Sequence, residues 1–192
     1  MNDNAGTKIR SFVALELSDE ARAELARIEE VLKKADANVK WVKPGSIHLT
    51  LKFLGYVPEG RIASISKKLE KIASEASPFD IVLSEIGVFP TWRQARVLWI
   101  GVGEGAEEVK SLARQVEDAM AQEGFEKEKR SFKSHLTIGR VRSAKNKEEL
   151  EKEALKIKVT PAPSHISKIV LFKSDLSPKG AVYTPLFEAK FV

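Results

Sequence analysis

Two short stretches decide how this chain is expected to fold: Ile47-His48-Leu49-Thr50-Leu51 and Ser134-His135-Leu136-Thr137-Ile138. Each contains a histidine followed by leucine, threonine and an aliphatic residue, although the chain has only three histidines. Side chains alternate between the two faces of a strand, so the histidine and the threonine share one face. The aliphatic residues share the other face and can hold the strand against a core. Each strand would then present an imidazole and a hydroxyl about 7 Å apart.

Around these stretches the chain repeats one order of elements, strand-helix-strand-helix-strand. The first copy is predicted as a strand at 12–17, a helix capped by Ser18, a strand at 47–54, a helix with Pro58 in its first turn, and a strand at 81–89. The second copy is predicted as a strand at 97–100, a helix ending near Gly124, a strand at 132–141, a weaker helix at 147–155, and a strand at 166–173. A last strand at 181–191 contains Pro185, which favours a sheet edge or a bulge.

The repeat indicates a duplicated α+β unit. His48 lies 36 residues after Phe12, and His135 lies 38 residues after Val97. We therefore expect residues 1–192 to form one compact bilobal domain, with residues 1–7 frayed. A site built from one strand of each half would lie in a central cleft on the pseudo-twofold axis.

Composition limits the class of protein and its expected location in the cell. The chain has 192 residues, 43% of them hydrophobic, which is enough for a real core. No apolar run approaches the roughly 20 residues that span a bilayer, and the polar N-terminus does not resemble a secretory signal. Cysteine is absent, which agrees with a reducing cytoplasm and leaves no thiolate metal ligands. We expect a cytoplasmic protein without a membrane partner.

The net charge of +5 is concentrated near the second histidine. Between 127 and 147 the chain carries eight basic residues and one acidic residue, a net charge of +7, so the rest of the chain is slightly acidic. A second stretch, 37–58, has no acidic residue and contains Lys40, Lys43 and Lys52. Each stretch includes one His-x-Thr motif, and phosphate is the ligand that such surroundings favour.

Two imidazoles and two hydroxyls can perform in-line substitution at a phosphodiester without a metal ion. An imidazole has an ordinary pKa near 6.5, so one ring can take a proton from the nucleophile while the other gives one to the leaving oxygen. The hydroxyls of Thr50 and Thr137 can donate hydrogen bonds to the non-bridging oxygens.

Other interpretations stay open from the residues alone. A histidine on a strand is often a structural residue, and two imidazoles can also bind zinc. The chain has neither a His-Glu-x-x-His motif nor an evident third ligand near either strand, which argues against zinc. His165 has no matching motif, and we interpret it as structural or exposed.

The chain resembles the RNA 2′,3′-cyclic phosphodiesterase (2′-5′ RNA ligase) family of the two-histidine phosphoesterase superfamily. The resemblance covers nearly the whole length and rests on a series of short matches. These are Phe12-Val13-Ala14-Leu15, Val39-Lys40-Trp41-Val42, His48 to Gly55, Gly87-Val88-Phe89-Pro90, Arg96-Val97-Leu98-Trp99, His135 to Arg140, and Phe172-Lys173-Ser174. It implies a bilobal α+β fold of mainly antiparallel sheets, with helices outside and both motifs facing a basic cleft.

The resemblance also implies hydrolysis of a terminal 2′,3′-cyclic phosphate of RNA to a 2′-phosphate, with no cofactor and no metal. By analogy His48 is the proton donor, His135 is the proton acceptor, and Thr50, Thr137 and Arg140 bind phosphate. Strict alternation places Arg140 on the face opposite His135, unless Gly139 allows a bulge.

Partners and base contacts are further expectations. The partner is RNA with cyclic phosphate ends, tRNA halves among them, and the protein is expected to be a monomer. Trp41 and Trp92 are candidates for base stacking, whereas Phe53 shares the parity of Leu49 and Leu51 and is expected to be buried. Two alternative functions are ATP-independent 2′-5′ ligation, which is the reverse reaction, and a catalytically silent RNA-end binding module.

Overall fold

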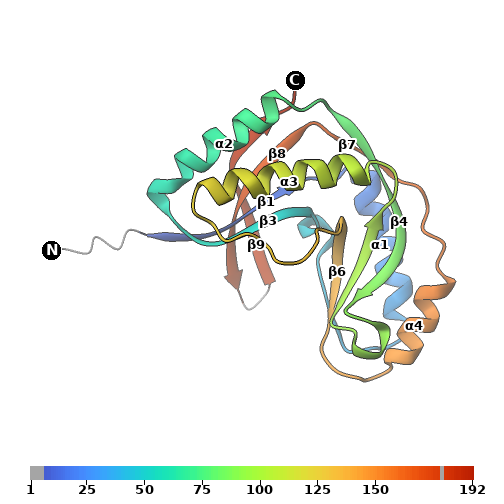
Figure 1. Cartoon of the computed structure of the whole chain (residues 1–192). Coiled ribbons are helices and arrows are strands. Elements are labelled where there is room, and N and C mark those ends of the chain that lie inside the picture. Colours follow the sequence, from blue (N-terminus) through green and yellow to red (C-terminus); the bar gives the residue numbers. More distant parts are fainter. Residues whose placement is uncertain (1–6, 178–179) are drawn as a thin grey trace.

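The computed structural model of the protein describes residues 7–177 and 180–192, and its strands form two antiparallel sheets (Figure 1). One sheet has the order β3-β1-β8-β9 and the other the order β2-β6-β5-β4-β7. The strands are β1 (Lys8–Leu15), β2 (Val39–Trp41), β3 (Leu49–Pro58), β4 (Phe79–Phe89), β5 (Val97–Val102), β6 (His135–Val141), β7 (Pro163–Ile166), β8 (Lys168–Ser177) and β9 (Gly180–Lys190). The helices are α1 (Asp19–Lys33), α2 (Ile62–Ser74), α3 (Ala106–Gln122) and α4 (Lys147–Lys156).

The two halves of the repeat exchange elements. Strand β4, the last strand of the first half, pairs with β5 in the second sheet, whereas β8 from the second half pairs with β1 in the first sheet. The helices are likewise mixed, since each sheet is covered by one helix from each half. Helices α2 and α3 pack together on the first sheet, and α1 packs with α4 and β7 on the second (Figure 1). Each sheet is therefore built and covered by elements of both halves.

Local sequence explains where several elements begin and end. The Ser18 hydroxyl accepts a hydrogen bond from the backbone N–H of Ala21 and caps α1, as predicted. Gly124, just past α3, has a φ of 82°, which glycine adopts readily. Strand β9 lies at a sheet edge, and its pairing with β8 shifts register next to Pro185, so both predicted features are confirmed.

Two boundary predictions need correction. Pro58 ends β3 rather than starting a helix, and a short 3-10 helix at Glu59–Arg61 separates it from α2. Strand β6 begins at His135, because residues 132–134 form no ladder. The predicted frayed segment lies outside the described residues except for Thr7, whose carbonyl oxygen accepts a hydrogen bond from the backbone N–H of Glu59.

One continuous core joins the two sheets. It includes Leu49 and Leu51 from β3 and Leu136 and Ile138 from β6, all of them buried. The aliphatic faces of both His-x-Thr strands therefore point into the core, as alternation predicts. A second, smaller cluster, formed by Phe12, Ala14, Val170 and Phe172, lies apart from this core. No helix in the described ranges is long and apolar enough to cross a membrane.

Candidate active site

His48 lies directly before β3, at the end of a turn that α1 holds in place. The Arg22 guanidinium donates hydrogen bonds to the carbonyl oxygens of Pro44 and Ile47, at 3.1 and 3.0 Å. Within that turn, His48 Nδ1 lies 3.0 Å from the carbonyl oxygen of Ser46. A carbonyl oxygen can only accept, so Nδ1 carries the proton and the neutral ring leaves Nε2 with its lone pair. The turn therefore sets both the orientation and the tautomer of the imidazole.

Aromatic side chains surround the His48 ring. Phe12 of β1 stacks on it with 4.5 Å between ring centroids, and Phe172 of β8 lies 6.0 Å away. Tyr183 of β9 meets it edge-on at 4.8 Å. Burial in these surroundings lowers the pKa of His48 to about 4, against the opposing effect of the hydrogen bond to Ser46, and the charge of Arg22 lowers the pKa further.

His135, the first residue of β6, repeats this arrangement. Its Nδ1 lies 2.7 Å from the carbonyl oxygen of Lys133, again two residues earlier in the chain. Phe89 meets the ring edge-on at 5.0 Å, and Trp99 lies 6.4 Å away. Burial lowers the pKa of His135, the hydrogen bond to Lys133 opposes this, and the charge of Lys133 lowers the pKa. Both imidazoles are thus held in the same tautomer and kept neutral near pH 7.

The two threonines face the same way as their histidines, and bulges extend this face. Thr50 lies opposite Ala14 and Thr137 lies opposite Trp99. In β6 the register then skips Ile138, so that Gly139 pairs with Leu98 and Arg140 with Val97. Residues paired across an antiparallel ladder point to the same face, and Val97 shares the face of Trp99. The bulge therefore returns Arg140 to the face that carries Thr137.

An equivalent bulge corrects our prediction for Phe53. In β3 the register skips Leu51, so Lys52 pairs with Val13 and Phe53 pairs with Phe12. Phe53 consequently joins the His48 face, 6.0 Å from the Phe12 ring, and is 63% exposed rather than buried. Strict alternation failed here for the same reason as at Arg140.

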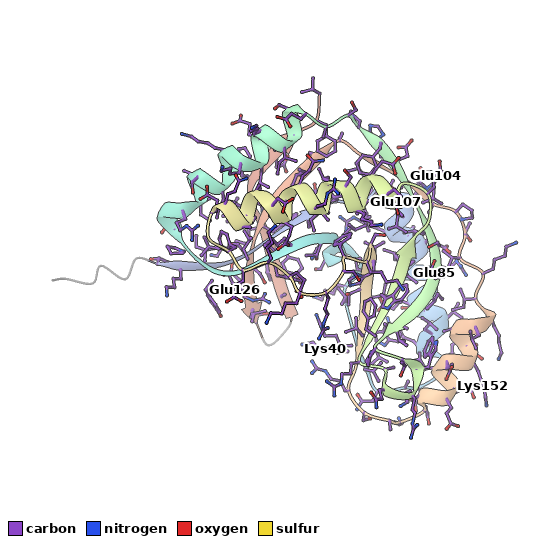
Figure 2. All side chains as sticks on the ribbon, in the orientation of Figure 1. Lys40, Glu85, Glu104, Glu107, Glu126 and Lys152 are labelled. Atoms are coloured by element: carbon purple, nitrogen blue, oxygen red, sulfur yellow. The ribbon has the colours of Figure 1, made fainter. Side chains whose placement is uncertain are left out.

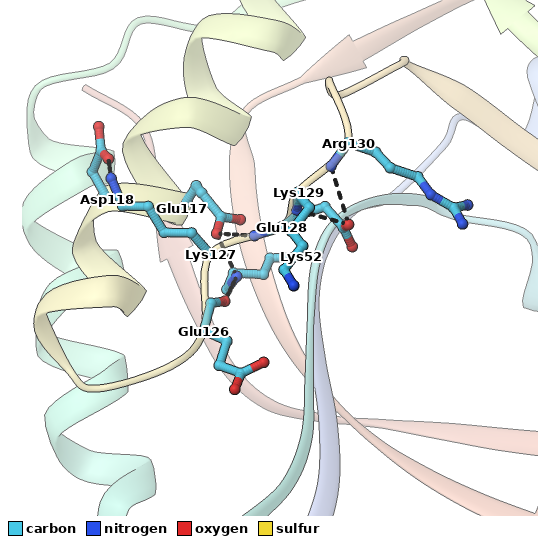
Figure 3. A network of polar contacts seen from close by, with 8 residues as sticks. All are labelled: Lys52, Glu117, Asp118, Glu126, Lys127, Glu128, Lys129 and Arg130. Atoms are coloured by element: carbon cyan, nitrogen blue, oxygen red, sulfur yellow. Dashed lines mark hydrogen bonds and ion pairs between the residues drawn. The ribbon is translucent and has the colours of Figure 1, made fainter.

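Lys52 is correspondingly turned away from the site. It is 7% exposed, and its Nζ lies 2.7 Å from Glu117 Oε1 and 3.0 Å from the carbonyl oxygen of Glu126 (Figure 3). Glu117 also accepts a hydrogen bond from the backbone N–H of Glu128. Lys52 therefore holds the segment that leads to His135 and does not lend its charge to the face of the His-x-Thr motif.

Ion pairs reduce the free positive charge of the basic stretch at 127–147. Lys127 pairs with Asp118 (Figure 3). Lys145 pairs with Asp36, so part of the positive charge is neutralised by residues outside the stretch. Lys133 instead lies over the Trp99 ring, with its Nζ 4.0 Å from the ring centroid. The charge near His135 thus comes from fewer residues than the sequence count suggests.

Strand β2 adds a cation beside Arg140. Lys40 pairs with Arg140 across the ladder, so both side chains point to the same face. Figure 2 shows Lys40 toward the middle of the molecule, whereas Lys152 lies on the outer helix α4. Arg140 also lines a surface hollow of about 600 Å³ between the 3-10 helix at Trp92–Gln94 and the start of α4.

Trp41 and Trp92 are half-buried and pack against the main core. Trp41 pairs with Gly139, on the face opposite Lys40 and Arg140, and would have to leave the core to reach a base. Base stacking on either ring stays a prediction. His165 is exposed, and its Nδ1 lies within hydrogen-bond distance of Asp80 Oδ1. Among the described residues no three His, Asp or Glu side chains form a group that could hold a metal ion.

Strands β3 and β6 approach each other although they belong to different sheets. Two His-x-Thr strands, one from each of two exchanged halves, define the class of two-histidine phosphoesterases. The sequence profile of LigT-like phosphoesterases matches the chain twice in succession, at residues 15–99 and 100–183. The chain belongs to this family, and the two matches follow the predicted duplication.

Known relatives agree in length and in fold. A protein of Methanothermobacter thermautotrophicus named RNA 2′,3′-cyclic phosphodiesterase is 36% identical over 180 residues, which cover 93% of this chain and 97% of that one. A protein of the same name from Aquifex aeolicus is 34% identical and covers 94% and 96%. A crystal structure from Thermus thermophilus superimposes with a TM-score of 0.79 at 26% identity and covers 95% and 98%. The predicted fold, family and enzyme class are confirmed.

Sequence reasoning missed the walls of the site. Phe12, Phe172 and Tyr183 reach His48 from strands β1, β8 and β9, and Phe89 reaches His135 from β4. No local spacing connects these residues with the histidines. Three of them, Phe12, Phe89 and Phe172, lie in segments that carry the family resemblance, which was the one available signal.

Proposed function

We propose that the protein hydrolyses the 2′,3′-cyclic phosphate at the 3′ end of an RNA to a 2′-phosphate, without a metal ion. The observation that carries the proposal is the matched pair of imidazoles. Each donates Nδ1–H to a carbonyl oxygen two residues earlier, and each shares a sheet face with a threonine. The relatives named RNA 2′,3′-cyclic phosphodiesterase support the choice of substrate.

The geometry suits in-line substitution at phosphorus. His135 Nε2 takes a proton from water as the water oxygen bonds to phosphorus, and the bond from phosphorus to the 3′ oxygen breaks. His48 Nε2 gives a proton to that 3′ oxygen, so the products are a free 3′ hydroxyl and a 2′-phosphate. Thr50, Thr137 and Arg140 hold the non-bridging oxygens as charge gathers there. The choice of His48 as acid follows the family resemblance.

Both pKa values agree with these roles once the substrate is bound. A neutral His135 can accept a proton at once. His48 must carry one, and the phosphate anion favours this because a nearby negative charge raises the pKa of an imidazole. In the free protein the pKa of His48 is about 4, so this ring stays neutral near pH 7 until the phosphate binds.

The test is product analysis on an oligoribonucleotide that ends in a 2′,3′-cyclic phosphate, in excess EDTA. We expect a 2′-phosphate product from the wild type, and a rate lower by about a hundred- to ten-thousand-fold in His48→Ala and in His135→Ala. His165→Ala, which removes the exposed third histidine, is the matched control and should keep full activity.

Full activity in either active-site variant would refute the proposal, and so would a requirement for added metal. Adding an RNA with a 5′ hydroxyl to the same assay reports whether ligation accompanies hydrolysis. Cytoplasmic location, a monomeric state and tRNA halves as substrates stay predictions.

A further inference from the structure

The hollow beyond Arg140 has an unusual charge. Four of its nine lining residues are basic, namely Arg96, Arg140, Arg142 and Lys147, and none is acidic. Lys147 donates a hydrogen bond to the carbonyl oxygen of Arg93 and so joins α4 to the opposite wall. The volume of about 600 Å³ lies within the usual range for ligand sites.

The three arginines of the hollow lack partners. Within the described part of the chain, none of their guanidinium groups has a hydrogen-bond or ion-pair partner. Nearby lysines differ, since Lys145 pairs with Asp36, Lys152 with Glu149 and Lys156 with Glu153. Like charges gathered in a hollow repel one another and create a positive potential, which an anion relieves. The cluster is therefore built for an anion that arrives from outside.

The hollow continues the face on which the proposed reaction takes place. Along β6 that face carries His135, Thr137 and, after the bulge, Arg140, which is also part of the hollow. Arg142 follows Arg140 by two residues, and the carbonyl oxygen of Arg96 accepts a hydrogen bond from the backbone N–H of Val141 between them. A chain with its terminal phosphate at the histidines could thus lay a second phosphate among these guanidinium groups.

We infer that the hollow lined by Arg96, Arg142 and Lys147 binds an internal phosphodiester of the RNA strand whose terminal cyclic phosphate lies at His48 and His135. This rests on the proposed function. The ligand is the backbone of single-stranded RNA, because planar guanidinium groups bind phosphate oxygens with two parallel hydrogen bonds and do not read bases there. A longer single strand can reach the hollow, whereas a nucleoside 2′,3′-cyclic phosphate, which has no internal phosphodiester, cannot.

The test compares two substrates in the double variant Arg96→Gln/Arg142→Gln. Both side chains are exposed and unpaired, so the fold is preserved, and Arg140 is left intact. For a hexaribonucleotide with a cyclic phosphate end we expect KM to rise about tenfold. The dependence of log KM on log salt should weaken by roughly 0.7, as for one phosphate of a single strand that is no longer neutralised. The kcat and KM for the mononucleotide should not change.

The matched control is Lys67→Gln/Lys71→Gln, which removes two exposed charges from α2 and keeps similar helix propensity. It should leave both substrates unaffected. An equal loss on hexamer and mononucleotide, or no loss on the hexamer, would overturn the inference. If the wild type hydrolyses neither substrate, the proposed function fails. In that case, fluorescence anisotropy with a hexamer that ends in a 2′-phosphate still tests whether the hollow binds RNA. The Kd should rise about tenfold in the arginine variant and not in the lysine control.

Discussion

The strands that carry His48 and His135 are alike in backbone and different in surroundings. In both, Nδ1 of the histidine bonds the carbonyl oxygen two residues earlier, and the threonine two residues later shares its face. In both, the pairing register skips the third residue after the histidine, Leu51 or Ile138. The fifth residue is thereby returned to the site face. The duplication has preserved the local geometry of both His-x-Thr strands.

The two halves differ in the side chains that surround this shared backbone geometry. The fifth residue is Phe53 in the first half and Arg140 in the second, and the ring of His48 is enclosed by Phe12, Phe172 and Tyr183. On the other side, Lys40 pairs with Arg140 across the ladder, and Lys133 lies over Trp99. One wall of the site is apolar, and the other combines the rings of Phe89 and Trp99 with cationic side chains. A substrate with a flat base next to an anionic phosphate matches this division.

The largest expected effect on activity tests whether the apolar wall and the cationic wall have different roles. Arg140→Ala should lower kcat/KM by about a hundred- to a thousand-fold on every cyclic phosphate substrate, because it removes hydrogen bonds to charge that grows in the transition state. Arg140→Lys should recover little, since an ammonium group lacks the planar pair of donors. Phe53→Ala, the equivalent change in the other half, should act mainly on KM and by less than about tenfold.

Steady-state kinetics on a nucleoside 2′,3′-cyclic phosphate measure both changes. Equal losses in Arg140→Ala and Phe53→Ala would show that the two walls are not specialised. The thermal midpoint of each variant, followed by circular dichroism, separates a local effect from misfolding.

Alternation of side chains in a strand predicts part of this site and misses the rest for a definite reason. It places Leu49 and Leu136 in the core and each threonine beside its histidine, because these residues precede the bulge. Beyond the bulge the parity reverses, as Phe53 and Arg140 both show. A bulge depends on the register with the partner strands β1 and β5, which no local pattern contains. The exchange of β4 and β8 between sheets is likewise a property of the assembled chain.

A smaller effect concerns stability, and it tests the apolar wall around His48. The pKa of His48 is about 4 in the folded protein and near 6.5 in the unfolded chain. Between these values the unfolded state binds the proton and the folded state does not, so stability is complete above pH 6.5 and falls as the pH is lowered. From pH 7 to pH 4.5 the loss attributable to His48 is about 2 kcal/mol.

Urea unfolding at the two pH values measures this loss. His48→Gln keeps a donor for the Ser46 carbonyl but does not titrate, so it should lose about 2 kcal/mol less than the wild type over the same range. His135→Gln is the counterpart in the other half, and it should also lose less than the wild type, because burial lowers the pKa of His135 too. Identical acid sensitivity in wild type and His48→Gln would contradict the depressed pKa.

The smallest expected effect tests the bulge on the cationic side. A Cβ at Gly139 would lie 2.6 Å from Val39 Cγ1 and 3.3 Å from the Trp41 ring, so Gly139→Ala must shift these side chains, and we expect β2 to move with them. We expect a cost of about 1 to 2 kcal/mol, at the lower end for overpacking, because β2 is a three-residue edge strand that can shift. Gly45→Ala is the control, since nothing lies within 4 Å of the added carbon.

The same shift should separate Lys40 from Arg140, because these two residues pair across β2 and β6. Gly139→Ala should therefore raise KM several-fold while His135 keeps its hydrogen bond to Lys133 and kcat changes little. An unchanged KM together with the expected loss of stability would show that Arg140 is held by the bulge alone. Edge strand β2 would then contribute to folding and not to the cationic wall.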